Sequence, residues 1–195
     1  MLLDNLNNRK IYLASKSPRR RELLAGMGVN FEVMNTDVDE TYDPAWSPER
    51  IVMHLSQLKL SPIDMKRYDP KTVFIACDTI VVVDGSIIGK PKDEADAARM
   101  LRMLSNHTHT VYSGLTVATP QRQLTDYRAT EVVFENLSDE MIQHYIQTYH
   151  PFDKAGSYGV QEWIGYVGIR EVRGSYYNVM GLPTRLLWQM LEKLV

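Results

Sequence analysis

The stretch VFIACDTIVVVDGSIIGKP, residues 73–91, has the strongest β-strand signal of the chain. Its apolar run is continuous rather than alternating, which indicates a strand buried on both faces of a sheet. Asp84-Gly85 suits a hairpin turn into a second short strand at Ile87-Ile88. Asp78 interrupts the apolar run, and a carboxylate in such a place must be ion-paired, hydrogen-bonded or bound to a metal. The stretch therefore predicts the centre of a sheet together with a first candidate for chemistry.

Outward from this stretch, strands and helices mix without a strict alternation of one strand with one helix. Further strands are expected over 10–14, 31–34, 109–118 and 123–134. Helices are expected where a capping residue precedes apolar residues at helical spacing, at about 18–27, from Ser47 onward, 93–104, 138–149 and 183–194. The glycine-rich segment 153–183 is expected to form short strands. This order predicts an α/β fold with a mixed β-sheet and flanking helices. It would form a single domain over 1–195, with two lobes around a central cleft.

The bulk properties describe an ordinary soluble globular protein, with 44% hydrophobic and 24% charged residues. The formal net charge of -2 argues against nucleic acid as a partner, because bulk nucleic-acid binding needs a basic excess. No run of 18 apolar residues predicts a membrane span, and the first residues lack the apolar stretch of a signal peptide. A single cysteine, Cys77, fits a reducing compartment. The expected location is the cytoplasm.

The segment LASKSPRRRELL, residues 13–24, places cations where a helix disfavours them. Ser17 suits an N-cap and Pro18 the first helical position, so Arg19, Arg20 and Arg21 fall in the first turn. Each cation there is disfavoured by roughly 0.3–1 kcal/mol. A strand, a serine-containing turn and a helix N-terminus form a ready anion site, to which arginine adds forked donors that match phosphate oxygens. We therefore expect this turn to bind a polyphosphate through its arginines, with Arg21 as a surface residue.

Three further residues have two interpretations each. Asp78 is a structural ion-pair member, or a general base or ligand for a hard cation. Glu40, in the acidic stretch DVDE, is solvated or shares a magnesium site with Asp78. Lys90 is a surface residue, or the partner of Asp78 or of a phosphate. The segment His107-Thr108-His109 has no obvious third ligand nearby and is interpreted as loop and strand.

Four stretches together resemble the Maf family of nucleotide pyrophosphatases: LASKSPRRRELL, DVDE, CDTIV followed by GKP, and DKAGSYGVQ followed by GSYYNVMGLP. Their order and spacing match over about residues 11–190. The resemblance implies hydrolysis of a nucleoside triphosphate to the monophosphate and pyrophosphate. It also implies a divalent cation, Mg²⁺ or Mn²⁺, a two-lobed Maf/ITPase-like fold with the active site in the cleft, and a homodimer.

The resemblance also assigns roles to residues. Asp78 falls on the proposed proton acceptor, while Arg19, Thr79 and Gln161 fall on the specificity positions. This trio resembles the branch that acts on dTTP and UTP. The sister branch, which acts on 7-methyl-GTP, tends to have an aromatic residue, a glutamine and a glutamate there. The other polar contacts fall on Ser15, Arg20, Glu40, Lys59 and Lys90. Glu40 and Asp78 are the expected metal ligands, and Glu40, Lys59 and Lys90 join Asp78 in the expected catalytic set.

Two positions depart from the family pattern. Leu60 follows Lys59 where alanine is more common, and Glu162-Trp163 follows Gln161 where a glycine is usual. These changes bear on the shape of the base pocket more than on the reaction. Three alternatives stay open: the 7-methyl-GTP branch, a nucleotide-binding regulator of cell division with little turnover, and an RNA-binding module. The carboxylate and lysine set around Asp78 favours an enzyme over a regulator, and the net charge disfavours the RNA-binding module.

Overall fold

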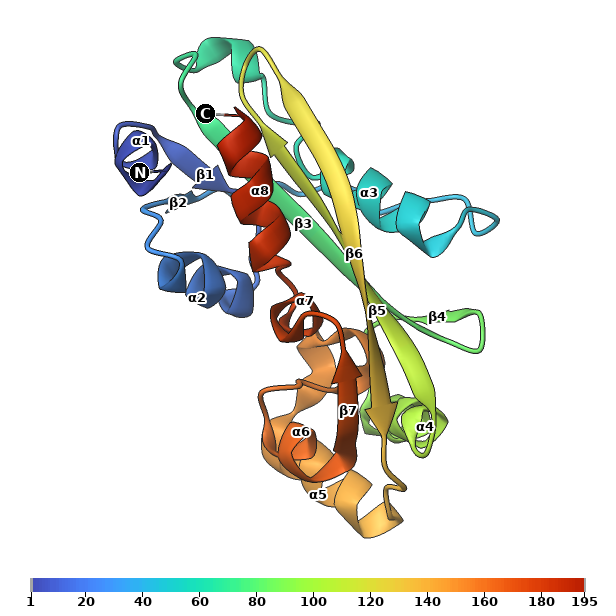
Figure 1. Ribbon diagram of the computed structural model, residues 1–195. Helices are drawn as coiled ribbons and strands as arrows, with labels where there is room; N and C mark the ends of the chain where they lie inside the picture. Colours follow the sequence, from blue (N-terminus) through green and yellow to red (C-terminus); the bar gives the residue numbers. More distant parts are fainter. Residues whose placement is uncertain (1, 195) are drawn as a thin grey trace. The chain divides into compact units, whose positions relative to one another are not determined.

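The computed structural model describes residues 2–194, which contain a seven-stranded mixed sheet with flanking helices (Figure 1). The sheet order is β2-β1-β3-β5-β6-β7, with β4 paired to β3. The strands are β1 Ile11–Leu13, β2 Glu32–Val33, β3 Val73–Val83, β4 Ser86–Ile88, β5 Thr108–Ala118, β6 Gln123–Phe134 and β7 Ile169–Arg173. Strand β1 runs parallel to β2 and β3, whereas β4 and β7 run antiparallel to β3 and β6. The predicted fold class is confirmed.

The helices are α1 Leu2–Asn7, α2 Pro18–Gly26, α3 Pro48–Leu58, α4 Glu94–Leu104, α5 Asp139–Tyr149, α6 Trp163–Gly168, α7 Tyr176–Met180 and α8 Thr184–Leu194. Helices α2, α3, α4 and α5 begin directly after a capping residue whose side chain accepts a backbone hydrogen bond. Short 3-10 turns lie at η1 Met65–Arg67, η2 Pro151–Asp153 and η3 Ala155–Ser157. Ser17, Ser47 and Ser138 each accept a hydrogen bond from the backbone N–H three residues on, which satisfies one orphan donor per helix. Within residues 2–194, no helix has the length and apolar character needed to cross a membrane.

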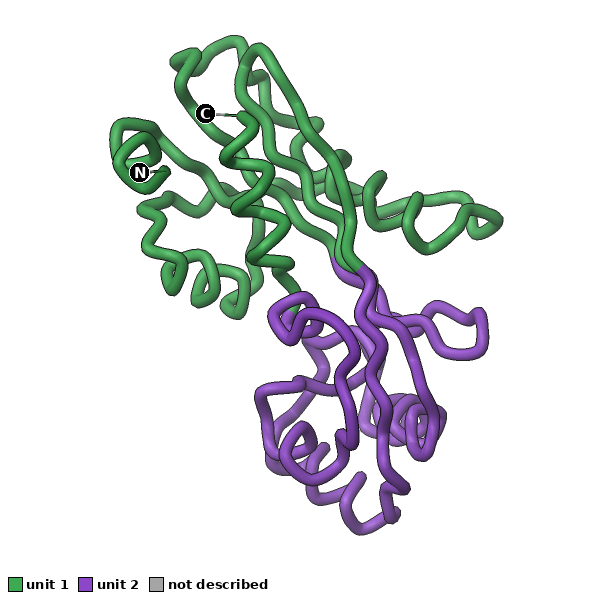
Figure 2. Tube along the Cα trace, viewed as in Figure 1, with its two compact units in different colours: residues 1–78, 113–128, 181–195 green, residues 79–112, 129–180 purple. Residues whose placement is uncertain are grey.

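The chain divides into two compact units (Figure 2). Unit 1 comprises residues 1–78, 113–128 and 181–195, and unit 2 comprises residues 79–112 and 129–180. Strands β3, β5 and β6 each contribute residues to both units. The single domain with a central cleft stays a prediction.

Strand β3 has the predicted character. Residues 73–78 are all buried, Val73 to Ile75 pair with β1, and Val81 to Val83 pair with β4. Asp84 and Gly85 form the predicted hairpin turn, with φ of 47° and 73°. Positive φ at both central residues is what a two-residue hairpin of this kind requires, and Asp-Gly tolerates it.

The segment 153–183 was predicted to form short strands, and this was wrong for most of its length. Only β7 is a strand, whereas η3, α6 and α7 are helical. Gly156 and Ser157 have φ of 71° and 62°, which interrupts an extended backbone. At Gly165 a Cβ would lie 1.8 Å from the carbonyl oxygen of Val160, so a glycine permits the tight helical turn there. Helix α1 was not predicted, although its residue Leu6 is buried.

Close packing of α3 on β5 decides where the end of α3 lies. A Cβ at Gly114 would stand 2.0 Å from the carbonyl oxygen of Val52, so only glycine permits this approach. The buried hydroxyls of Ser56 and Thr116 are 2.8 Å apart, and Thr116 lies 3.1 Å from the hydroxyl of Thr125 on β6. The Gln57 amide donates to Thr125 at 3.1 Å. These bonds hold the last turn of α3, after which Lys59 follows directly.

Candidate active site

Lys59 lies between two carboxylates of unit 1. It is the C-cap of α3, and its side chain is 11% exposed. Its Nζ lies 2.8 Å from Oδ1 of Asp78, whose side chain is 12% exposed, and it also donates a hydrogen bond to Oε1 of Glu40. Lys59 therefore supplies the compensating charge that a buried carboxylate in β3 requires. The interpretation of Lys90 as the partner of Asp78 is corrected, because the structure assigns that ion pair to Lys59.

Electrostatics keep Lys59 cationic. Burial by itself lowers the pKa of Lys59, but the charges and hydrogen bonds of Asp78 and Glu40 outweigh it and raise the pKa above its ordinary value. The three side chains together hold one more negative than positive charge. A site of this kind offers an ammonium donor to phosphate oxygens and carboxylate acceptors to a cation or a proton.

The donor set of Glu40 and Asp78 suits a hard divalent cation. Mg²⁺ prefers oxygen ligands and is usually bound through one or two carboxylates, with substrate phosphates and water completing the shell. In the part of the chain that the structure describes, there is no group of three or more His, Cys, Asp and Glu side chains placed to hold a metal. Two carboxylates that meet at one lysine therefore fit a cation whose other ligands come with the substrate.

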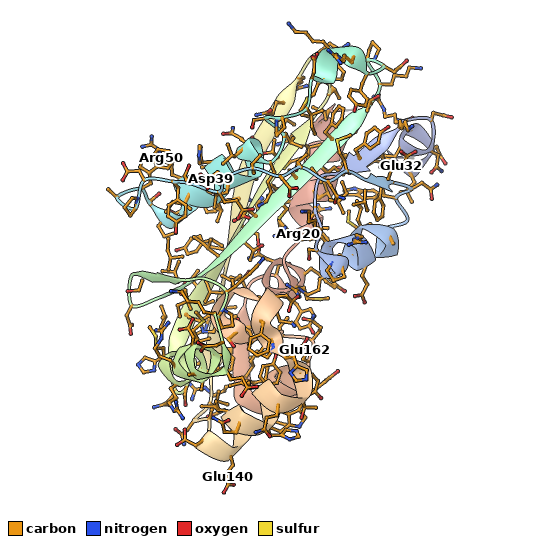
Figure 3. The ribbon with its side chains drawn as sticks, turned by 180° about the vertical axis from the view of Figure 1, so that it is seen from behind. Arg20, Glu32, Asp39, Arg50, Glu140 and Glu162 are labelled. Carbon is orange, nitrogen blue, oxygen red and sulfur yellow. The ribbon has the colours of Figure 1, made fainter. Side chains whose placement is uncertain are left out.

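A second set of predicted residues meets at the start of α2. The Oγ of Ser15 accepts hydrogen bonds from the backbone N–H of Ser17 at 3.2 Å and from Arg20 at 3.3 Å. Arg20 also donates through Nε to the carbonyl of Gly181 at 2.8 Å, and it is labelled in Figure 3. These two bonds orient the guanidinium of Arg20 within unit 1.

The neighbours of Arg20 in the first turn differ from each other in exposure. Arg19 is half-buried, whereas Arg21 is exposed and donates to the carbonyl of Lys16 at 2.8 Å. The expectation that Arg21 is a surface residue is therefore confirmed. The cationic first turn itself is present, since α2 begins at Pro18 behind the Ser17 cap.

Three predicted residues belong to unit 2, and each is described there by itself. Thr79 follows Asp78 along β3 and is half-buried, and Lys90 is exposed just after β4. Gln161 lies between η3 and α6, and its Oε1 is buried without a hydrogen-bond partner among the described residues. A buried acceptor without a partner is costly, so Gln161 is suited to a ligand that donates a hydrogen bond.

The histidine pair occupies a loop and a strand, as predicted, with His107 just before β5 and His109 in β5. The Nε2 of His109, in β5, lies 2.7 Å from the hydroxyl of Tyr158, and His109 is buried. His107 places Nδ1 2.8 Å from the carbonyl oxygen of Ser105. Each ring is thus held by a local polar contact.

Comparison with known proteins gives the family. Residues 10–194 match the family described as Maf-like protein. The chain belongs to the Maf family. It is 46% identical over 193 residues to a dTTP/UTP pyrophosphatase of Porphyromonas gingivalis, covering 98% of this chain and 97% of that protein. It is also 46% identical over 194 residues to a dTTP/UTP pyrophosphatase of Phocaeicola vulgatus, covering 99% and 100%. The predicted membership of the Maf family is confirmed.

A solved structure shows the same fold. The Ham1 protein of Staphylococcus aureus matches with a TM-score of 0.51 and 16% identity, covering 94% of this chain and 98% of that one. At this identity the likeness concerns the fold alone. It supports the mixed α/β architecture that the Maf resemblance implies.

Sequence reasoning missed several residues that hold these sites. The hydroxyls of Ser56 and Thr116 had no signal, because their pairing depends on how α3 lies on β5. Tyr145 and Lys154 were not singled out, although both contact Glu162. The departure from the Maf pattern at Glu162 was the one available signal in the sequence, and it marked the position without its partners.

Proposed function

We propose that this Maf-family chain hydrolyses nucleoside triphosphates, with dTTP and UTP preferred, to the monophosphate and pyrophosphate. The observation that carries the proposal is Lys59 held between Glu40 and Asp78, with Arg20 oriented on Ser15 in the same unit. Relatives that match almost the full length of the chain are named dTTP/UTP pyrophosphatases. Cationic and carboxylate groups together supply what cleavage between the α- and β-phosphates requires.

The cations of unit 1 bind the polyphosphate. Arg20 presents a guanidinium whose orientation is already set by Ser15 and Gly181, so little conformational freedom is lost on binding. Lys59 adds an ammonium whose pKa is raised by its carboxylate partners. A guanidinium and an ammonium placed in this way stabilise the negative charge that develops on phosphate oxygens in the transition state.

Asp78 accepts the proton of the attacking water. It is the more buried of the two carboxylates of the site and lies on β3, which is paired with β1 and β5. General base catalysis contributes typically about 10²–10⁴-fold. Lys59 holds the Asp78 carboxylate in one place and is the positive charge next to it.

Glu40 and Asp78 would hold the divalent cation. Mg²⁺ or Mn²⁺, when bound, neutralises the charge that develops on the phosphates. Glu40 lies in an exposed loop, with its side chain 54% exposed, and it approaches the site through Lys59. Asp78 is the fixed member of the pair.

Arg19, Thr79, Lys90 and Gln161 complete the proposed set. The resemblance to the Maf family assigns Lys90 to the phosphates and the other three to the base. A site built to hydrogen-bond a polar ring edge strongly rejects a ligand that lacks it. The unpartnered Oε1 of Gln161 is an acceptor for an N–H of the pyrimidine ring.

The proposal extends to assembly, location and purpose. We infer a homodimer in the cytoplasm that acts on nucleotides rather than nucleic acids, including the clearance of non-standard nucleotides from the pool. Light scattering on the purified chain then gives twice the 22.4 kDa of one copy. A mass of one copy contradicts the dimer and leaves the reaction untouched.

The experiment measures pyrophosphate release from dTTP, UTP, CTP, GTP and 7-methyl-GTP, with Mg²⁺ and with Mn²⁺. We expect dTTP and UTP to exceed the other substrates by at least about tenfold in kcat/KM. Tight binding of dTTP without pyrophosphate release indicates a regulator instead. Preference for 7-methyl-GTP indicates the sister branch, and equal rates on all substrates refute the selectivity.

A further inference from the structure

Both carboxylate oxygens of Glu162 are engaged inside unit 2. Oε2 accepts a hydrogen bond from the hydroxyl of Tyr145 on α5, and Oε1 lies 3.1 Å from Nζ of Lys154. Tyr145 is fully buried, and the side chains of Lys154 and Glu162 are only 9% and 20% exposed. Glu162 is the N-cap residue of α6, and its place in the molecule is labelled in Figure 3. A half-buried carboxylate is therefore matched here by one cation and one neutral donor.

The same groups close the turn formed by residues 159–162. The hydroxyl oxygen of Tyr145 accepts the backbone N–H of Gly159 at 2.9 Å, while the N–H of Glu162 donates to the carbonyl of Gly159 at 3.0 Å. A Cβ on Gly159 would lie 2.8 Å from Cδ of Glu162, so the carboxylate rests directly on the glycine. Side-chain and backbone bonds thus connect the first and the last residue of the turn.

Gln161 lies inside this closed turn. Its buried Oε1 has no partner in residues 2–194, whereas the N–H of Gly159 and the carboxylate of Glu162 on either side of it both have partners. The direction of that acceptor depends on the backbone of the turn, because rotation of Glu162 or Gly159 moves Gln161 with them. A side chain at position 162 without a carboxylate leaves the Tyr145 hydroxyl and the Lys154 ammonium without this acceptor.

The Tyr145 hydroxyl keeps its proton near neutral pH. Burial raises the pKa of Tyr145, and its hydrogen bond to Glu162 raises it further, so the hydroxyl stays a donor. Lys154 also pairs with Asp153 at 2.8 Å, which provides it with a second negative partner. No member of this network needs to touch a nucleotide in order to orient the turn.

We propose that Glu162, anchored by Tyr145 and Lys154, is a positioning residue that aims Gln161 at the nucleotide base and so tightens selection for thymine and uracil. The inference rests on the proposed function and deepens it. Without this anchor the turn is less well positioned, and the contact between Gln161 and the base becomes weaker. This contact is made equally in the ground and transition states. The expected result is a higher KM for dTTP, with a smaller change in kcat.

The test compares three variants. Tyr145→Phe removes the hydroxyl without removing the ring, and Glu162→Met removes both acceptor oxygens while it keeps the length of the side chain. Tyr149→Phe is the matched control, because Tyr149 stacks on Tyr145 in the same helix at 5.2 Å and no hydrogen bond of its hydroxyl is found in the described structure. Calorimetric titration without divalent metal measures the Kd of dTTP and of CTP for each variant, and thermal melting reports the fold.

We expect the CTP/dTTP ratio of Kd to fall about five- to tenfold in Tyr145→Phe, the size of a lost hydrogen bond, and at least as much in Glu162→Met, which also removes the carboxylate partner of Lys154. The double variant loses less than the sum of the two single variants, because both remove the bond between Tyr145 and Glu162, and Tyr149→Phe keeps the parental ratio. If Tyr145→Phe does not fold, Glu162→Met decides alone.

A lowered melting temperature with an unchanged ratio shows that the network is merely structural and overturns the inference. A parent protein that binds dTTP no better than CTP overturns it as well. A parent that prefers dTTP in binding yet releases no pyrophosphate refutes the proposed function instead. In that case the CTP/dTTP ratio of Kd in the variants still tests the inference.

Discussion

Two lysines, one in each unit, are buried between two carboxylates. The partners of Lys59 are Glu40 and Asp78, and those of Lys154 are Asp153 and Glu162. The two clusters have the same charges and similar burial of the lysine. They differ in how many of the carboxylate oxygens already have partners. This difference distinguishes a site that can perform chemistry from a site that only holds a turn in place.

Around Lys154, both oxygens of one carboxylate, Glu162, have partners. Glu162 has Tyr145 on one oxygen and Lys154 on the other, and Gly159 packs against it. Around Lys59, by contrast, that lysine is the only side-chain partner found for either carboxylate within residues 2–194. An ionised carboxylate has about four acceptor positions, so Glu40 and Asp78 keep room for a cation, a water or a proton.

The largest effect is expected from breaking the cluster of unit 1. Lys59→Met leaves Asp78 buried without its cation, so the free energy of unfolding falls by about 3–5 kcal/mol. Urea unfolding at pH 7 measures the change. Lys66→Met, at an exposed lysine of η1 in the same unit, is the control. A loss no larger than that of the control contradicts the assignment of Lys59 as the stabilising partner.

The pH dependence of the same variant tests the pair separately. The pKa of Lys59 is raised in the folded state, so the unfolded chain releases this proton first as the pH rises. The contribution of Lys59 is complete below its ordinary pKa of 10.5 and is lost as the pH rises through the folded value. The free energy of unfolding of the parent therefore falls in alkali as Lys59 loses its proton. The Lys59→Met variant lacks this part of the fall.

Acid is expected to weaken unit 2. Burial lowers the pKa of His109 from 6.5 to about 4. Between these two pH values the unfolded chain binds a proton at His109 and the folded chain does not. This contribution is complete above pH 6.5, and about 3 kcal/mol of it is lost as the pH falls to about 4. Urea midpoints of the parent and of His109→Asn between pH 7 and pH 4 compare the two slopes. Parallel slopes show that His109 does not titrate in this way.

A smaller effect is expected at the turn that unit 2 anchors. Gln161→Glu replaces the amide by a carboxylate, which accepts but does not donate a hydrogen bond, and it adds a charge near the base. Selectivity for dTTP over CTP falls about tenfold in kcat/KM, while the melting temperature stays close to that of the parent. Gln143→Glu, at an exposed position of α5, is the matched charge control. Loss of stability without loss of selectivity argues against a role for Gln161 in base recognition.

Local patterns predicted most of the fold. The continuous apolar run predicted β3, Asp84-Gly85 predicted its hairpin, and the serine caps predicted the starts of α2, α3 and α5. Each of these features depends on residues that are close in the sequence. Segment 153–183 failed because its glycines serve close approaches and positive φ in helical turns, which composition does not distinguish from turns between strands.

The sequence predicted which residues belong to the candidate site, but it did not predict which of them pair with each other. The sequence indicated that Asp78 needs a partner or a metal, and it offered Lys90 as a candidate partner, whereas the structure pairs Asp78 with Lys59. The choice of Lys59 depends on α3 lying against β5, through Gly114 and the Ser56 hydroxyl. Such contacts join residues distant in sequence, and no local pattern records them. The same holds for Tyr145, which lies on α5, and Glu162, which precedes α6.

The most direct test of the account is kcat at saturating dTTP for Asp78→Asn. This change keeps the shape of the side chain and removes its ability to accept a proton. The account predicts a loss of at least about a hundredfold in pyrophosphate release, with dTTP still bound and the fold retained. Turnover equal to that of the parent, in a folded Asp78→Asn protein, would contradict the claim that the Glu40, Lys59 and Asp78 cluster performs the chemistry.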